Sequence, residues 1–135
     1  MPRRLPLLLL LVSLPVLSCT DATGPAPAVV GTWRLQTVNG RPLPFTLSEG
    51  PADKLELTGE ALTLAASGTF TMVTTFRVTE GSNVFPESVP DEGTYEVIGA
   101  SVRFTFHSDG SVSTMAVSGD TMTDADIDTF VYRRD

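Results

Sequence analysis

Hydrophobic and polar side chains alternate along most of the chain after residue 30, with the two-residue period of β-strands. The clearest run covers residues 69–78, where every second side chain from Phe70 to Val78 shares one face of the predicted strand. A first strand is predicted at residues 30–38, with Trp33 and Val38 on opposite faces. It ends at an Asn-Gly pair, which favours a tight hairpin turn.

Similar short apolar runs follow, separated by turns rich in Gly, Asp and Ser. Residues 55–64 fit either a hairpin or one long bent strand, and residues 80–92, which contain Pro86 and Pro90, are predicted as the longest loop. The pattern predicts an all-β fold, an up-and-down antiparallel meander of about eight strands closed into a barrel. Closure would also remove the exposed edges of a small sheet.

The N-terminal residues are typical of a protein exported through the membrane. Arg3 and Arg4 precede an apolar run that is too short to span a bilayer. The sequence Val-Leu-Ser-Cys that ends at Cys19 resembles the lipobox of bacterial lipoproteins, which implies a lipid anchor on this cysteine. The alternative is a plain secretory signal peptide. We expect a signal peptide at residues 1–18, the lipidated cysteine and a flexible tether at 19–29, and the folded domain at 30–135.

Composition narrows the classes of function. Cys19 is the only cysteine, so the chain forms no internal disulfide and no cysteine-based metal or redox site. Without Arg3 and Arg4, seven basic residues face sixteen acidic ones, a net charge of about −9. Such a domain is a poor partner for nucleic acid or for anionic lipid, which leaves the anchor as its membrane attachment. Thr20 after the anchor favours the outer membrane, with the domain facing the periplasm.

Gly31-Thr32-Trp33 resembles the Gly-x-Trp signature of lipocalins, the ligand-carrying eight-stranded barrels. The ordered runs GTWRLQTVNGRPLP, SGTFT, EGTYEV, SGDTMT and FVYRR resemble a group of small bacterial lipocalin-like lipoproteins, most of them without an assigned function. The resemblance implies that Arg133 or Arg134 closes one end of the barrel over the Trp33 ring. The first run also resembles META-type envelope domains, whose later Gly-Cys-Asn motif is absent.

The aromatic residues offer two interpretations. They either line an apolar ligand cavity or fill the barrel as its core. The segment around Phe85 would then be a lid, with Phe85 as an exposed tip or a plug. The residues concerned are Trp33, Phe45, Phe70, Phe76, Tyr95, Phe104, Phe106 and Tyr132.

Candidates for catalysis or metal binding are few. His107, the only histidine, is predicted to face solvent and lacks a recognisable nucleophile motif nearby. Asp124, Asp126 and Asp128 superficially resemble the start of a calcium loop, but Thr129 stands where such a loop needs Gly. Alternation would place these three carboxylates on the outer face of a strand. We therefore expect no enzyme activity, no metal site and no cofactor.

Two functions follow as expectations. The first is a lipid-anchored envelope protein of lipocalin type that binds a small apolar ligand or lipid. The second is a solid-core barrel that acts as an interaction module, either an envelope scaffold or an inhibitor, without a small-molecule ligand. A filled interior, together with exposed apolar residues such as Phe85, would favour the second.

Overall fold

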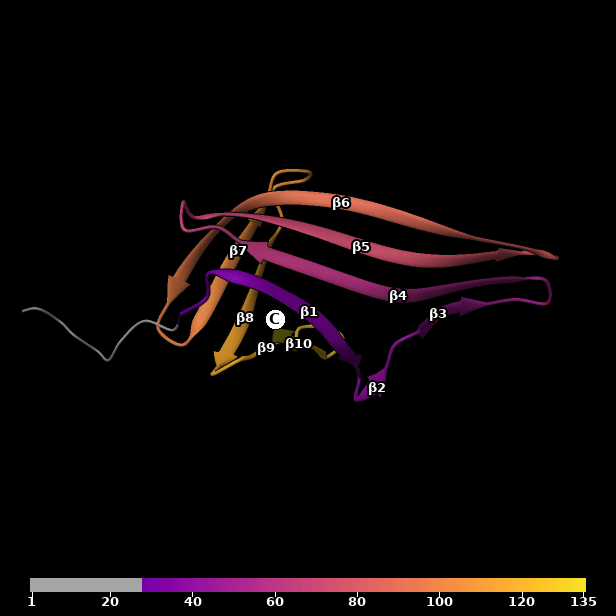
Figure 1. The fold of residues 1–135 in the computed structure, drawn as a ribbon, viewed down its shortest axis with the longest axis horizontal. Helices are drawn as coiled ribbons and strands as arrows, with labels where there is room; N and C mark the ends of the chain where they lie inside the picture. The colour runs from indigo at the N-terminus through magenta and orange to yellow at the C-terminus, as the bar shows by residue number, and fades with distance from the viewer. Residues whose placement is uncertain (1–27) are drawn as a thin grey trace, which may run out of the picture.

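The computed structural model describes residues 28–135, a succession of β-strands joined by turns (Figure 1). The predicted signal peptide, Cys19 and nearly all of the predicted tether lie outside these residues. No helix long and apolar enough to cross a membrane occurs in the described part. In chain order the strands are β1 (Gly31–Val38), β2 (Arg41–Pro42), β3 (Phe45–Glu49), β4 (Asp53–Leu64), β5 (Thr69–Glu80), β6 (Asn83–Ile98), β7 (Ser101–Phe106), β8 (Val112–Ser118), β9 (Thr121–Asp124) and β10 (Phe130–Arg134).

Eight of these strands close into an antiparallel barrel. Each strand from β4 to β10 pairs with the next, β10 pairs with β1, and β1 pairs with β4 to complete the ring. β2 and β3 lie outside the ring as short strands on β1 and β4. The predicted all-β, up-and-down antiparallel barrel of about eight strands is confirmed. Residues 55–64 belong to one long strand with a bulge between Leu57 and Gly59.

A bulge in β1 changes which residues reach the core. The pairing of β1 with β10 shifts register between Leu35 and Thr37, so the alternation of faces shifts there too. Val38 consequently lies in the core with only 1% of its surface exposed, and the prediction that it faces away from Trp33 was wrong. The turn itself is as predicted, because Asn39 and Gly40 have φ values of 51° and 74°.

The predicted long loop at residues 80–92 was also wrong, because residues 83–92 form the first part of β6. β5 and β6 are joined by the two-residue turn Gly81-Ser82, so Glu80 and Asn83 form the hydrogen-bonded pair next to it. Alternate residues from Val84 onward then point their N–H groups away from β5. Pro86 and Pro90 occupy two of these positions, where a missing N–H breaks no bond of the ladder.

The folded domain begins slightly earlier than predicted. Val29, assigned to the tether, is buried in the core, and its carbonyl oxygen accepts a hydrogen bond from the Trp33 indole Nε1 at 2.8 Å. The chain therefore joins the barrel beside Trp33.

The strands β4, β5 and β6 are longer than the barrel requires. β1 pairs with β4 only at Ala61–Leu64, and β7 pairs with β6 only at Gly93–Ile98. The remaining halves of these strands, with β3 along one edge, form a four-stranded sheet that extends from the barrel to the right of Figure 1. We call this extension, residues 45–57, 76–80 and 83–87, the arm.

Candidate functional site

One end of the barrel is closed by a cation–π contact. The Arg134 guanidinium lies 4.6 Å from the centre of the Trp33 ring, and Arg134 Nε is 3.7 Å from an oxygen of Asp120. Of the two arginines that the resemblance offered for this position, Arg134 makes the contact, whereas Arg133 is exposed on the outer face of β10. The Trp33 ring beneath the guanidinium is fully buried.

The barrel interior is filled by side chains. All the aromatic residues named as cavity or core candidates belong to one apolar cluster, in which Trp33 and Phe104 are fully buried. The Phe70 ring meets the Phe104 and Phe106 rings edge to face, each at 5.1 Å between centroids. The largest fully buried side chains are Trp33, Phe70, Phe104, Leu62, Leu64, Met122, Val38 and Val102. The arrangement is that of a packed core.

A small polar group lies inside the barrel next to this core. The Tyr132 hydroxyl donates to Glu60 Oε1 at 2.5 Å, and the Thr74 hydroxyl donates to Glu60 Oε2 at 2.7 Å. Burial raises the pKa of Tyr132, and the nearby charges of Glu60 and Asp124 raise it further. Tyr132 therefore acts as a neutral hydrogen-bond donor that holds the Glu60 carboxylate in place.

Glu60 is reached from outside through a groove where β1 and β4 separate. Beyond the pair Arg34–Ala61 the two strands no longer bond to each other. The opening, about 450 Å³ in volume, has Leu35, Leu43 and Glu60 among its lining residues. Its lining is mixed, with the apolar Leu35 and Leu43 beside the charged Arg34 and Glu60.

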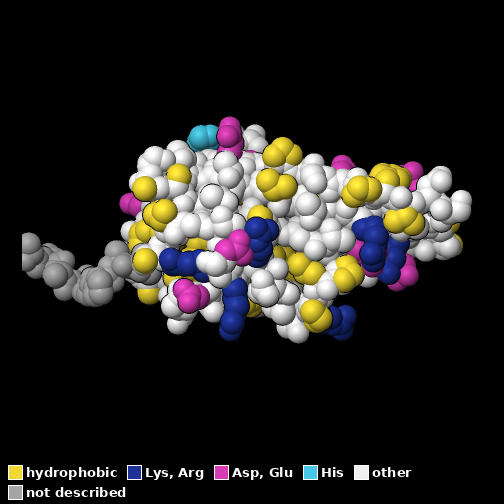
Figure 2. All heavy atoms as spheres, in the orientation of Figure 1, with side chains coloured by type: hydrophobic (Ala, Val, Ile, Leu, Met, Phe, Trp, Pro, Cys, Tyr) yellow, Lys and Arg dark blue, Asp and Glu magenta, His cyan; other side chains and the backbone are white. Residues whose placement is uncertain are grey.

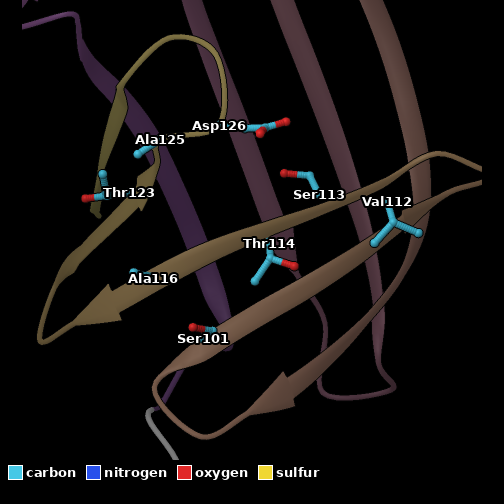
Figure 3. A pocket seen from close by; sticks show the side chains of 8 residues that line it. All are labelled: Ser101, Val112, Ser113, Thr114, Ala116, Thr123, Ala125 and Asp126. Carbon is cyan, nitrogen blue, oxygen red and sulfur yellow. The ribbon is translucent and has the colours of Figure 1, made fainter.

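A second hollow, of about 490 Å³, opens where β9 separates from β8 (Figure 3). β8 and β9 pair only as far as Ala116 and Thr123, and beyond this pair the gap is bridged by a hydrogen bond from the Ser113 hydroxyl to Asp124 at 3.0 Å. Figure 3 shows mostly small side chains around the opening, with Asp126 as its one charged residue. Such a lining offers little to recognise a ligand.

The structure separates the three aspartates that superficially resembled a calcium loop. Asp124 is on the inward side of β9, where it accepts a hydrogen bond from Ser113. Asp126 and Asp128 lie in the turn before β10, and Asp128 accepts a hydrogen bond from the Asn39 amide at 2.9 Å. The prediction of three carboxylates on one outer face was therefore wrong, because the strand ends at Asp124. Residues 28–135 contain no cluster of three potential metal ligands.

His107 is exposed in the turn that follows β7, and its backbone N–H donates to the carbonyl oxygen of Glu92. Its side chain forms no hydrogen bond to a carboxylate or hydroxyl within the described residues, so the structure adds no orienting partner for it. The absence of enzyme activity stays a prediction.

The arm carries the largest departure from a simple barrel. Residues directly opposite each other on paired strands share a face, so the register assigns each side chain to one of two faces. The inner face continues the barrel interior and comprises Phe45, Ser48, Asp53, Leu55, Leu57, Phe76, Val78, Glu80, Asn83, Phe85 and Glu87. The outer face comprises Thr46, Glu49, Lys54, Glu56, Arg77, Thr79, Val84 and Pro86.

Exposure on the inner face rises away from the barrel and toward the free edge of β6. Leu57, next to the barrel, is 3% exposed, Phe76 and Val78 are half-buried, and Phe85 is 40% exposed. The apolar cluster of the barrel therefore continues outward onto a surface that nothing in the described chain covers. A surface of this kind is typical of a binding site for another molecule.

On the outer face, one carboxylate holds two basic side chains. Glu56 Oε2 lies 2.7 Å from Arg77 Nε, and Glu56 Oε1 lies 3.1 Å from Lys54 Nζ. The hydrogen bonds from Arg77 and then Lys54 lower the pKa of Glu56 to about 2. Figure 2 shows Lys and Arg side chains gathered over the arm beside acidic and hydrophobic ones.

Sequence reasoning did not find the arm. The signal that could have revealed it was strand length, because the alternation from Phe70 to Val78 already exceeds what a small barrel strand needs. Glu60 was also missed as an interior residue, since a carboxylate in a strand is ordinarily placed on the solvent face. The chain matches no protein-family model, and no curated protein is significantly similar to it.

Proposed function

We propose that this chain is a lipid-anchored interaction module of the bacterial envelope, a solid-core barrel that binds a partner protein through its arm. Cys19 carries the anchor in this proposal, and the outer membrane, with the domain facing the periplasm, is the proposed location. No catalytic role is assigned.

The observation that carries the proposal is the exposed apolar inner face of the arm. Phe85 on this face is 40% exposed, and Val89, where β6 returns toward the barrel, is 45% exposed. Burying such side chains against a partner is favourable by roughly 25 cal/mol per Å². The packed barrel supports the same proposal, because the space in which a lipocalin would hold its ligand is occupied by Trp33, Phe104 and their neighbours.

Photo-crosslinking in living cells tests the proposal. A photoreactive amino acid replaces Phe85 in the full chain, produced at its natural level in the bacterium that carries the gene. A matched control places it at Arg103, which is exposed on the barrel wall. We expect a defined protein adduct from position 85 and none from position 103. Adducts from both positions, or from neither, would refute the assignment.

A second candidate, a small-ligand carrier of lipocalin type, is favoured by one observation. The groove between β1 and β4 presents the Glu60 carboxylate, held by Tyr132, beside Leu43 and Arg34. Native mass spectrometry of the gently purified full chain tests it. Bound mass that disappears in a Glu60→Gln variant would support a ligand at this groove, whereas a bare polypeptide mass would exclude a tightly held one.

A further inference from the structure

The inner face of the arm combines apolar side chains with carboxylates. Leu55 and Val78 lie side by side at its centre, flanked by Ser48 and Phe85 in the same row. The next row toward the tip places Asp53 opposite Glu80, and the row toward the barrel contains Glu87. The apolar centre of this face is therefore bordered by acidic residues on both sides.

Charge is segregated between the two faces of the arm. Its two basic residues, Lys54 and Arg77, point to the outer face, where both pair with Glu56. None of the inner carboxylates forms a salt bridge within residues 28–135. The inner face is consequently both apolar and negatively charged, and its charge is not neutralised by the chain itself.

These residues also surround a real depression. A groove of about 480 Å³ near the tip has Leu55 and Val78 among its lining residues, together with Asp53, Glu80 and Glu87. Lys54 also lines it, but its ammonium group pairs with Glu56. A groove of this volume accepts one or two side chains of a partner. Carboxylates at its margin favour lysine or arginine next to the inserted apolar residue.

The free edge of β6 is a poor alternative for docking. Adding a strand there would require N–H donors along the edge, and Pro86 and Pro90 lack them. The arm therefore offers its face rather than this edge. A second copy of the chain is an unfavourable occupant of the inner face, because it would bring Glu80 and Glu87 against a second set of carboxylates. Membranes rich in anionic lipid are repelled for the same reason.

We propose that the inner face of the arm binds a basic amphipathic peptide segment of a partner protein. Apolar side chains of this segment enter the groove over Leu55 and Val78, and its lysine or arginine side chains pair with Asp53, Glu80 and Glu87. The proposal rests on the proposed function of the arm and specifies the chemistry of its partner.

The test uses the full chain in non-ionic detergent and a fluorescent peptide of alternating leucine and lysine, with fluorescence anisotropy as the readout and empty micelles as the blank. We expect binding that weakens as salt rises. The double variant Glu80→Lys, Glu87→Lys should weaken it about tenfold, because two attractions become repulsions. Glu96→Lys makes the same kind of charge change on the exposed outer side of the barrel and should leave the affinity within about twofold.

Three results would overturn the proposal. The first is equal binding of a control peptide in which glutamate replaces lysine, and the second is an equal loss of affinity in the Glu96→Lys variant. The third is a dimer in sedimentation experiments that the double variant abolishes, which would make a second copy the occupant. If the Leu/Lys peptide fails but photo-crosslinking from Phe85 still captures a partner, the proposed chemistry is wrong and the proposed function stands. If both fail, the arm is not a docking surface.

Discussion

Among the glycines of the described chain, Gly93 leaves the least space for a Cβ atom, and its replacement by alanine should destabilise the domain strongly. It is the first residue of β6 that pairs with β7. A Cβ atom at this position would lie 2.0 Å from the Thr105 carbonyl oxygen and 2.8 Å from Cε1 of the Phe70 ring. Ordinary contact begins near 3.4 Å, so the Thr105 carbonyl would have to move by about 1.4 Å.

The cost can be estimated from the structure. A shift of this size in a central pair of strands disrupts about one backbone hydrogen bond, worth about 1 kcal/mol, and overpacks the core beside Phe70 at a further 1 to 3 kcal/mol, roughly. We expect Gly93→Ala to lower the free energy of unfolding by about 3 kcal/mol. For a domain of this size that corresponds to a decrease in Tm on the order of 15 °C.

Urea unfolding of a soluble form that begins at Thr20 measures this change. Trp33, the only tryptophan, is fully buried and reports the loss of the core through its fluorescence. Gly50→Ala is the matched control, because a Cβ atom there would have its nearest neighbour, the Asp53 carbonyl oxygen, at 3.8 Å. The control should stay within about 0.5 kcal/mol of the natural protein. An equally small effect of Gly93→Ala would refute the close packing at this position.

Three further predictions concern side chains. Because the pKa of Glu56 is lowered from 4.5 to about 2, its ion pairs stabilise the fold fully above pH 4.5 and lose this effect as the pH falls toward 2. Glu56→Gln should therefore be less stable than the natural protein at pH 7 in urea unfolding, and a stability difference that persists unchanged at pH 2 would contradict this. Arg134→Ala should cost about 1 kcal/mol and alter tryptophan fluorescence, whereas Arg133→Ala should do neither. Tyr132→Phe removes a donor from Glu60 and should lower the free energy of unfolding by about 1 to 3 kcal/mol, which thermal unfolding followed by circular dichroism would detect.

The barrel could be predicted because each strand and turn is indicated by a pattern within a few consecutive residues. The alternation that starts at Phe70 fixes a strand and its inward face, and Asn39-Gly40 fixes the turn that follows the first strand. The bulge after Leu35 could not be predicted in the same way. It depends on how β10 pairs with β1, a contact between the two ends of the domain, and it reverses the face on which Val38 lies.

The arm was missed for a related reason. Pro86 and Pro90 indicate a loop in a sequence considered alone, yet an edge strand tolerates proline where the nitrogen points away from its neighbour. Whether a segment is an edge strand depends on the whole sheet. The same holds for Glu60, whose inward position follows from its distance along β4 from the bulge between Leu57 and Gly59.

The chain joins the barrel beside Trp33, at the end opposite the tip of the arm. Given the proposed anchor on Cys19, this arrangement would determine how far from the membrane the arm can reach. β5 runs from the closed end to the tip and is about 36 Å long at about 3.3 Å per residue. The residues between Cys19 and Val29 span at most about 35 Å when fully extended. With Cys19 held in a bilayer, the tip of the arm could reach positions on the order of 70 Å from the membrane surface. The anchored domain could then bind partner proteins that are not themselves attached to the same membrane.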